Sequence, residues 1–190
     1  MTEGKKRCFW CNLKNPVYIK YHDEEWGFPD FSESYLYEML LLESFQAGLS
    51  WECVLNKRDA FRAAFDGFDL AAVCSYGEDK LLELQENKSI IRHKAKLRAA
   101  VENSKIFREI QNRFGSFRDY LFSFTGGKIY YETGNTRNAL SDAISKDLQA
   151  RGMKYVGSVI IYAYLQAIGV IYSHEADCFL HKQCADDSFS

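Results

Sequence analysis

Cysteine and histidine residues gather at both ends of this chain, and this feature most limits how it can fold. The residues are, in chain order, Cys8, Cys11, His22, His174, Cys178, His181 and Cys184. A structural Zn²⁺ site uses about four such ligands in a tetrahedron. One ion can take ligands from both groups only if the fold brings the two ends of the chain together. Scattered buried thiols and surface imidazoles are the alternative, because short metal-ligand motifs are often fortuitous.

The composition predicts one globular, all-α domain over residues 1–190. The chain is 47% apolar and 15% aromatic, which excludes a disordered protein. Two prolines and twelve glycines favour long helices over many short strands. The first residues lack the apolar centre of a secretory signal, and no run of about 18 apolar residues could span a membrane. We therefore expect a protein of the reducing cytoplasm whose cysteines are core residues or metal ligands.

A basic stretch over residues 88–108 stands out against a net charge of −2. Its basic residues are Lys88, Arg92, Lys94, Lys96, Arg98, Lys105 and Arg108, with His93 among them. Such a cluster can neutralise DNA phosphates. The solvated face of a helix is the more ordinary interpretation.

Apolar spacing predicts a succession of helices. We expect one over residues 33–47, with Asp30 or Ser32 as its N-cap and Gly48 at its end. A second follows Ser50 in an i, i+3, i+4, i+7 pattern that is broken at Arg58. Further helices are expected around residues 81–84, 88–108, 117–124, near 140 and over 157–168, with an irregular loop or short ribbon over 125–138.

The segment 151–157 reads Arg-Gly-Met-Lys-Tyr-Val-Gly and lies between two of these predicted helices. Its two glycines allow a tight turn with positive φ. The helix that follows would present free backbone N–H groups and a positive dipole end, which can hold a phosphate. An ordinary helix–helix turn would have the same composition.

Glu43 is the most unusual carboxylate of the chain. It shares a helical face with Leu36, Leu40 and Ala47, where it would lose its hydration. A cationic ligand could supply the missing partner, and a structural acid paired with a nearby arginine is the alternative. Aromatic residues flank the same region, namely Trp10, Tyr18, Tyr21, Trp26 and Trp51. Aromatic faces attract cations and stack on bases, although core packing is their usual role.

Taken together, these residues resemble the DNA-3-methyladenine glycosylase I family of bacterial base-excision repair enzymes. The resemblance runs from about residue 7 to 178. Its most specific blocks are Tyr21-His22-Asp23-x-Glu25-Trp26-Gly27 and Glu43-x-x-Gln46-Ala47-Gly48-Leu49-Ser50-Trp51, and the stretch Arg151-Gly152-x-Lys154-x-Val156-Gly157 also matches. It implies a helix-hairpin-helix DNA glycosylase fold, with the motif at about residues 141–169.

The resemblance also implies one structural Zn²⁺ per chain that ties the termini together. Its ligands would be Cys8, His22, His174 and Cys178. Spacing alone would favour Cys11 over His22, whereas the family pattern favours His22. His181 and Cys184 lie beyond the matched region.

The family pattern further assigns a base pocket and a DNA interface. Glu43 would hydrogen-bond to the extruded base, Trp51 would stack on it, and Tyr18, Tyr21, Trp10 and Trp26 would surround it. Gly48 and Leu49 would fill the gap left in the duplex. Gly152, Lys154 and Gly157 would hold a backbone phosphate.

The implied activity is hydrolysis of the glycosidic bond of 3-methyladenine in double-stranded DNA by a monomeric enzyme. The methylated base is already cationic, so Glu43 need only recognise it after base flipping. No acid follows Gly157 up to Ala163, and no lysine nucleophile is evident, which predicts a monofunctional enzyme without lyase activity. A lesion-binding module without hydrolysis and a zinc-dependent hydrolase are the alternatives.

Overall fold

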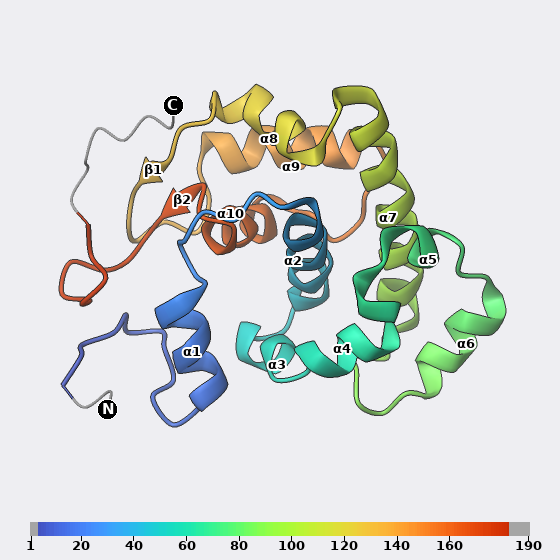
Figure 1. Cartoon of the computed structure of the whole chain (residues 1–190), viewed down its shortest axis with the longest axis horizontal. Helices are drawn as coiled ribbons and strands as arrows, with labels where there is room; N and C mark the ends of the chain where they lie inside the picture. The colour runs from blue at the N-terminus through green and yellow to red at the C-terminus, as the bar shows by residue number, and fades with distance from the viewer. Residues whose placement is uncertain (1–3, 183–190) are drawn as a thin grey trace.

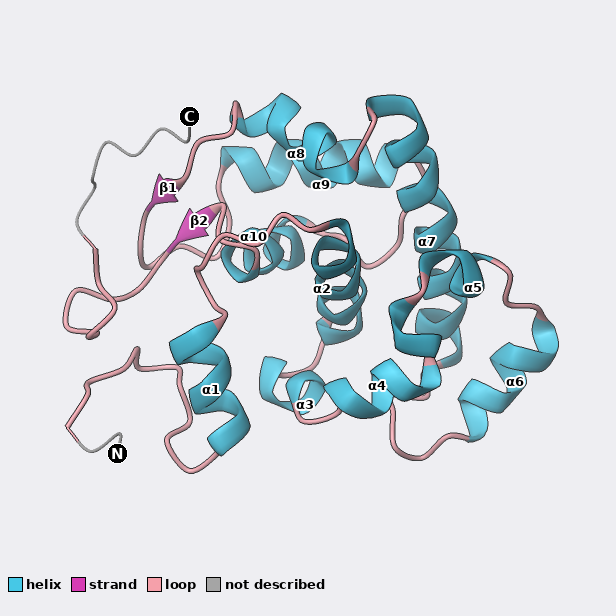
Figure 2. Cartoon of the chain, in the orientation of Figure 1, coloured by secondary structure: helices cyan, strands magenta, loops and turns pink. Residues whose placement is uncertain are grey.

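The computed structural model describes residues 4–182 and confirms a fold that is almost entirely helical (Figures 1 and 2). In this part of the chain the helices are α1 (Pro16–Glu24), α2 (Glu33–Gln46), α3 (Trp51–Leu55), α4 (Arg58–Ala64), α5 (Leu70–Cys74), α6 (Glu78–Glu86), α7 (Lys94–Phe114), α8 (Phe117–Thr125), α9 (Ala139–Ala150) and α10 (Ser158–Ala167), with a 3₁₀ turn at Asp66–Phe68. Two short strands, β1 (Tyr130–Tyr131) and β2 (Ile171–Tyr172), pair in parallel.

Helix α2 is the centre of the molecule, and α3, α7, α8 and α10 pack around it. Every residue from Leu36 to Phe45 except Glu38 is buried, so the helix is apolar on nearly all sides. Such a pattern is typical of a helix enclosed by others. The predicted helix over 33–47 is therefore confirmed within one residue, and Ser32 is its N-cap. Its burial places Glu43 inside the core.

The segments near the two ends of the chain lie side by side, beyond α1 and β2 (Figure 1). The Phe179 N–H donates to the Lys6 carbonyl at 2.8 Å. The loop before α2 also packs on the end of α10, where the Gly27 N–H donates to the Gln166 carbonyl at 3.0 Å. A Cβ on Gly169 would lie 2.4 Å from the backbone nitrogen of Pro29. This close approach requires glycine, and it brings the loop between α1 and α2 against the chain that follows α10.

Two local predictions need correction, and two helices, α1 and α5, were not predicted. The helix expected after Ser50 is two helices, because the chain turns at residues 56–57 between α3 and α4. The basic stretch is helical only from Lys94 onward. The pattern also did not predict α1, although Asn15 caps it through its side chain and Pro16 occupies its first turn, a favourable position for proline.

The turn between α9 and α10 confirms only part of the glycine prediction. Gly152 has a φ of +105°, whereas Gly157 has a φ of −62° and forms the N-cap of α10. The second residue with positive φ is Tyr155, at +57°. An L-residue rarely adopts this conformation, so surrounding contacts must hold the turn in place.

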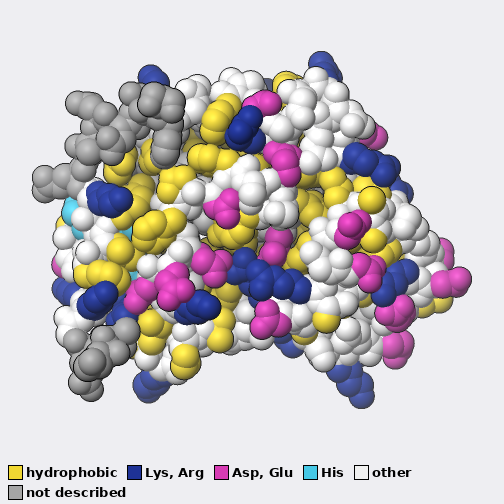
Figure 3. All heavy atoms as spheres, in the orientation of Figure 1, with side chains coloured by type: hydrophobic (Ala, Val, Ile, Leu, Met, Phe, Trp, Pro, Cys, Tyr) yellow, Lys and Arg dark blue, Asp and Glu magenta, His cyan; other side chains and the backbone are white. Residues whose placement is uncertain are grey.

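Opposite charges are interspersed on the face of the molecule shown in Figure 3. No broad field of one sign is visible there, which agrees with the net charge of −2. Over residues 4–182, none of the helices combines the length and the apolarity needed to cross a bilayer.

Candidate active site and metal centre

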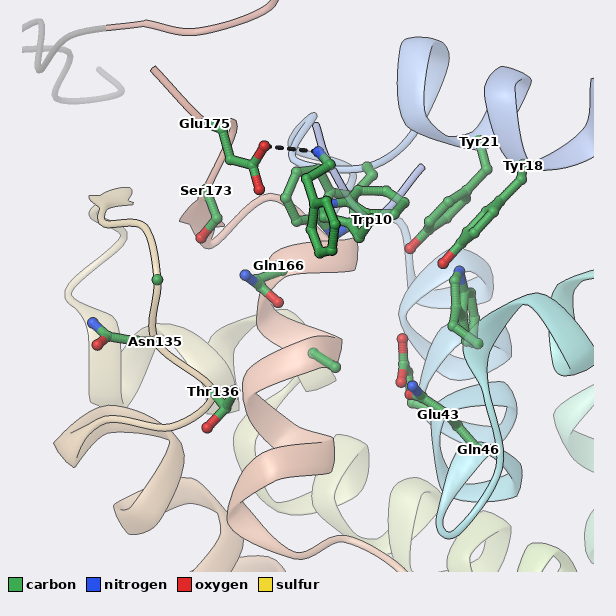
Figure 4. Close-up of a pocket in the computed structure, with 15 residues that line it drawn as sticks. Trp10, Tyr18, Tyr21, Glu43, Gln46, Asn135, Thr136, Gln166, Ser173 and Glu175 are labelled. Carbon is green, nitrogen blue, oxygen red and sulfur yellow. Dashed lines mark hydrogen bonds between the residues drawn. The ribbon is translucent and has the colours of Figure 1, made fainter. Parts of the chain in front are cut away.

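A cavity of about 500 Å³ opens between α1, α2, α3, α10 and four non-helical segments around residues 9–10, 26, 134–136 and 173–175 (Figure 4). Its volume is typical of sites for small organic ligands, about 300–1,000 Å³. One side is aromatic and comes from α1, α3 and the segment before α1. Glu43 and Gln46 of α2 lie at its edge in Figure 4. The cavity brings together all six residues that the sequence assigned to the base pocket.

Glu43 faces this cavity without an arginine beside it. Its side chain is 2% exposed, and its Oε2 has no hydrogen-bond partner within the described residues. Burial raises the pKa of the Glu43 carboxyl well above its usual value. The buried guanidinium of Arg58 pairs instead with Glu25 at 2.5 Å and Glu38 at 2.6 Å. The carboxyl of Glu43 is thus held apart from protein cations, in a site that would favour a cationic ligand.

Two further polar atoms beside Glu43 lack partners in the described part of the chain. They are Oε1 of Gln46 and Nε1 of Trp51. Unpaired polar atoms are rare in protein interiors, and a cluster of them indicates a ligand or ordered water. The sequence analysis did not assign Gln46 to the site. Its position three residues after Glu43, on the same helical face, was the signal that could have found it.

Aromatic rings build the other wall of the cavity. The Tyr21 and Trp51 ring centroids lie 5.4 Å apart, and Trp10 lies 5.3 Å from Tyr18 and 4.6 Å from Trp26. Burial raises the pKa of Tyr18 to about 12, so its hydroxyl is a hydrogen-bond donor at neutral pH. The hydroxyls of Tyr18 and Tyr21 point toward the Glu43 side of the cavity in Figure 4. Flat apolar walls with few polar groups suit a planar heterocycle.

The wall opposite Glu43 contains residues that the sequence analysis missed. They are Asn135, Thr136, Gln166, Ser173 and Glu175 (Figure 4). Three different segments contribute them, so no local pattern in the sequence connects them. The Glu175 Oε2 accepts a hydrogen bond from the Phe9 N–H at 2.7 Å, which joins the N-terminal and C-terminal segments at the rim of the cavity.

The candidate metal ligands meet next to this rim. Ligand atoms of Cys8, His22, His174 and Cys178 all lie within 4.8 Å of one another, and all four residues are buried. Cys178 Sγ is 3.5 Å from His22 Nε2 and 3.5 Å from His174 Nδ1, and Cys8 Sγ is 3.5 Å from His174 Nδ1. A tetrahedral ion with Zn–S of about 2.3 Å and Zn–N of about 2.0 Å requires S···N separations of about 3.5 Å. The four residues therefore fit zinc.

Cys11 is outside this group, since its Sγ lies 3.9 Å from the Tyr18 carbonyl. Spacing alone would have chosen a residue outside the cluster, whereas the family pattern chose His22, which the fold brings into it. His181 is also apart, with its Nδ1 2.8 Å from the His174 carbonyl oxygen. Cys184 lies outside the described residues.

Each histidine of the cluster has a partner for its second ring nitrogen. His22 Nδ1 lies 2.8 Å from Asp23 Oδ1, and His174 Nε2 lies 3.1 Å from the Trp26 carbonyl oxygen. Metal-bound histidines are typically oriented in this way. Burial lowers the pKa of His174 to about 4 and raises that of the Cys8 thiol to about 12. The imidazole is thus ready as a neutral ligand, whereas the thiol needs a cation to lose its proton.

The predicted DNA-contact residues lie on two turns, and all of them except the half-buried Gly157 are exposed. Leu49 is 43% exposed and follows Gly48, whose φ is +76°. Lys154 is exposed in the turn before α10. Both backbone groups of Lys154 are held by Asn103, whose Nδ2 donates to the carbonyl and whose Oδ1 accepts from the N–H, each at 2.9 Å.

The basic stretch is not one surface, because Lys96 is 8% exposed and lies in the core. Arg98 pairs with Glu78 at 2.6 Å, and Lys105 pairs with Glu102 at 2.8 Å. Exposed basic residues lie just before α7 and at its first position, namely Lys88, Arg92, His93 and Lys94.

This chain is similar in sequence and in fold to known DNA glycosylases. The sequence profile of the methyladenine glycosylases matches residues 10–181. The chain is 37% identical over 179 residues to DNA-3-methyladenine glycosylase 1 of Escherichia coli (strain K12), with 91% of this chain and 95% of the relative covered. A crystal structure of a 3-methyladenine DNA glycosylase I superposes with a TM-score of 0.89 at 38% identity and covers 93% of this chain and 100% of the other. The Staphylococcus aureus enzyme, solved to explain 3-methyladenine recognition, superposes with a TM-score of 0.86 at 32% identity, covering 90% and 95%.

Proposed function

The chain belongs to the methyladenine glycosylase family of DNA glycosylases, and we propose that it releases 3-methyladenine from alkylated double-stranded DNA. The relatives are named for this base, and the cavity suits a planar, positively charged ligand. The observation that carries the proposal is the buried carboxyl of Glu43, which has an unpartnered oxygen among aromatic rings.

Recognition of the base would depend on Glu43, Gln46 and Trp51. The two unpartnered oxygens can accept hydrogen bonds from N–H groups of the base. Trp51 would stack on its face, and the positive charge of the methylated purine would compensate the Glu43 carboxylate inside the low-dielectric cavity. Neutral adenine lacks that charge, so it would leave the ionised carboxylate uncompensated.

Access to the cavity requires the nucleotide to leave the duplex. Gly48 and Leu49 occupy an exposed turn beside the end of α2, where an apolar side chain can fill the space of the missing base. The turn with Gly152, Lys154 and Gly157 precedes the positive end of α10, which would hold a backbone phosphate as in helix-hairpin-helix proteins.

Bond cleavage would need little help from an acid. A cationic base is a good leaving group, and the departing sugar carries positive charge that the DNA phosphates can stabilise before water adds. Helix α10 contains no carboxylate and none of the residues that line the cavity in the described part of the chain is a lysine. A covalent sugar–lysine intermediate has no candidate there, so we propose a monofunctional enzyme without lyase activity.

Cys8, His22, His174 and Cys178 would hold Zn²⁺ in a closed tetrahedron with a structural role. When bound, the ion stabilises both thiolates. Four protein ligands leave no position for a reactive water, so the site does not favour zinc-dependent hydrolysis. The same proposal includes a single glycosylase domain over 1–190 that acts as a monomer in the cytoplasm.

The test is a mass-resolved assay of the bases released from methylated duplex DNA. The proposal predicts free 3-methyladenine, no release of undamaged adenine, and no strand cleavage before alkali treatment. A protein that binds methylated DNA but releases no base would instead be a lesion-binding module. Strand cleavage without alkali would contradict only the absence of lyase activity.

A further inference from the structure

Lys96 is the most deeply buried lysine side chain that the mechanism above leaves unused. It lies in the first turn of α7, and the residue is 8% exposed. Its Nζ donates to the Phe45 carbonyl at 2.7 Å and to the Ala47 carbonyl at 2.5 Å. Burial of an ammonium is costly, and here it lowers the pKa of Lys96. A buried ammonium at this position therefore indicates that Lys96 has a specific structural or functional role.

The two carbonyls that accept from Lys96 belong to the end of α2. The last carbonyls of a helix lack partners within the helix and carry its negative dipole end, so a cation stabilises them. This last turn bears Gln46, and the chain continues directly into Gly48 and Leu49. The Ala47 carbonyl that accepts from Lys96 therefore lies two residues before Leu49.

The same helix also fixes the turn before α10. Lys96 Nζ lies 5.6 Å from the centre of the Tyr155 ring, within the range of a cation–π interaction. Asn103 lies seven residues further along α7, which is about two turns and the same face. It holds both backbone groups of Lys154. One face of α7 therefore contacts the end of α2, directly before the Gly48–Leu49 turn, and the 151–157 turn.

We infer that Lys96 is a positioning residue that fixes the Gly48–Leu49 turn relative to the 151–157 turn. The Gly48–Leu49 turn would then insert into the duplex beside the backbone phosphate that the 151–157 turn binds. This inference rests on the proposed function. Lys96 would affect extrusion of the nucleotide more than recognition of the free base, because its ammonium binds backbone carbonyls of α2 and not the side chains of Glu43, Gln46 or Trp51.

The test compares Lys96→Met with wild-type protein in two measurements. Single-turnover release of 3-methyladenine from duplex DNA is expected to fall about tenfold, since hydrogen bonds from a charged donor are lost. Binding of free 3-methyladenine, followed by tryptophan fluorescence, is expected to stay within about twofold of wild type. Lys57→Met is the matched control, because it removes a lysine whose Nζ donates to the Ser89 carbonyl at 3.0 Å. Lys96→Gln replaces Lys96→Met if the latter does not fold.

A double-mutant cycle with Leu49→Ala makes the test specific. If Lys96 acts through this turn, Lys96→Met slows release less than about threefold once Leu49 is alanine. Additive effects of the two substitutions would overturn the inference, and so would unchanged release by Lys96→Met. Equal losses of base binding and release would also overturn it, because they indicate only general damage to α2. Absence of release by the wild-type protein would reject the proposed function and this inference together.

Discussion

Replacing Glu43 by glutamine should slow base release without weakening the fold. In the free protein the Oε2 of Glu43 has no partner among the described residues, so the substitution breaks no hydrogen bond of that oxygen. A bound cationic base would meet a neutral acceptor in place of a charged one. A hydrogen bond to a charged group contributes about 1.5–3 kcal/mol. At about 1.4 kcal/mol for each factor of ten, kcat/KM for 3-methyladenine release should fall about 10- to 150-fold.

The same variant should change how stability depends on pH. Burial raises the pKa of the Glu43 carboxyl well above its usual value of 4.5. Between these two pKa values the folded state keeps a proton that the unfolded state has released, so the wild-type protein loses stability as the pH rises through this interval. Glutamine has no proton to lose. The difference in Tm, variant minus wild type, should therefore grow as the pH is raised from about 5 to about 8.

Single-turnover release from methylated duplex DNA and thermal unfolding measure the two effects. Glu86→Gln makes the same chemical change on an exposed carboxyl of α6 and should match the wild-type protein in both assays. Release by Glu43→Gln within about twofold of wild type would refute the recognition argument. A pH-independent difference in Tm would refute the account of the buried carboxyl.

Three other predictions concern the supports of the site. Cys178→Ser should abolish stoichiometric zinc binding and lower Tm, whereas Cys11→Ser should keep one zinc per chain. Elemental analysis measures the zinc content and calorimetry measures Tm. Loss of zinc from Cys11→Ser would contradict the ligand assignment. Asn103→Leu leaves two backbone groups of the 151–157 turn without their partner, so the free energy of unfolding in urea should fall by about 2 kcal/mol. DNA binding should also weaken, and unchanged binding would argue against a DNA role for this turn. Arg58→Met removes the buried guanidinium that pairs with the carboxylates of Glu25 and Glu38. The free energy of unfolding should fall by about 3 kcal/mol in the same assay, and a loss below about 1 kcal/mol would contradict this prediction.

The sequence could predict the parts of the fold that local chemistry determines. Helix α2 has apolar residues on nearly all sides, so both its existence and its burial follow from its own segment. Because Glu43 lies within that apolar helix, its own segment also made it a candidate for a buried carboxylate without a cationic partner. His22 was predictable only from the family pattern, because the fold, and not the spacing, brings it beside Cys178 and leaves Cys11 elsewhere.

The remaining features depend on contacts between distant segments. Lys96 belongs to a basic stretch that reads as surface, and only its approach to the end of α2 shows why it is buried. Asn135, Gln166 and Glu175 lie on separate segments, and none carries a periodic signal that assigns it to a cavity. The positive φ of Tyr155 could not be expected, because Gly157, two residues later, could adopt positive φ at lower cost.

The most direct measurement is a crystal structure of this chain with 3-methyladenine bound. The account predicts the base in the cavity, with its N–H groups about 2.6–3.2 Å from oxygens of Glu43 and Gln46 and its ring against Trp51. A base bound elsewhere, or a Glu43 carboxyl turned away from the ligand toward a protein partner, would contradict it.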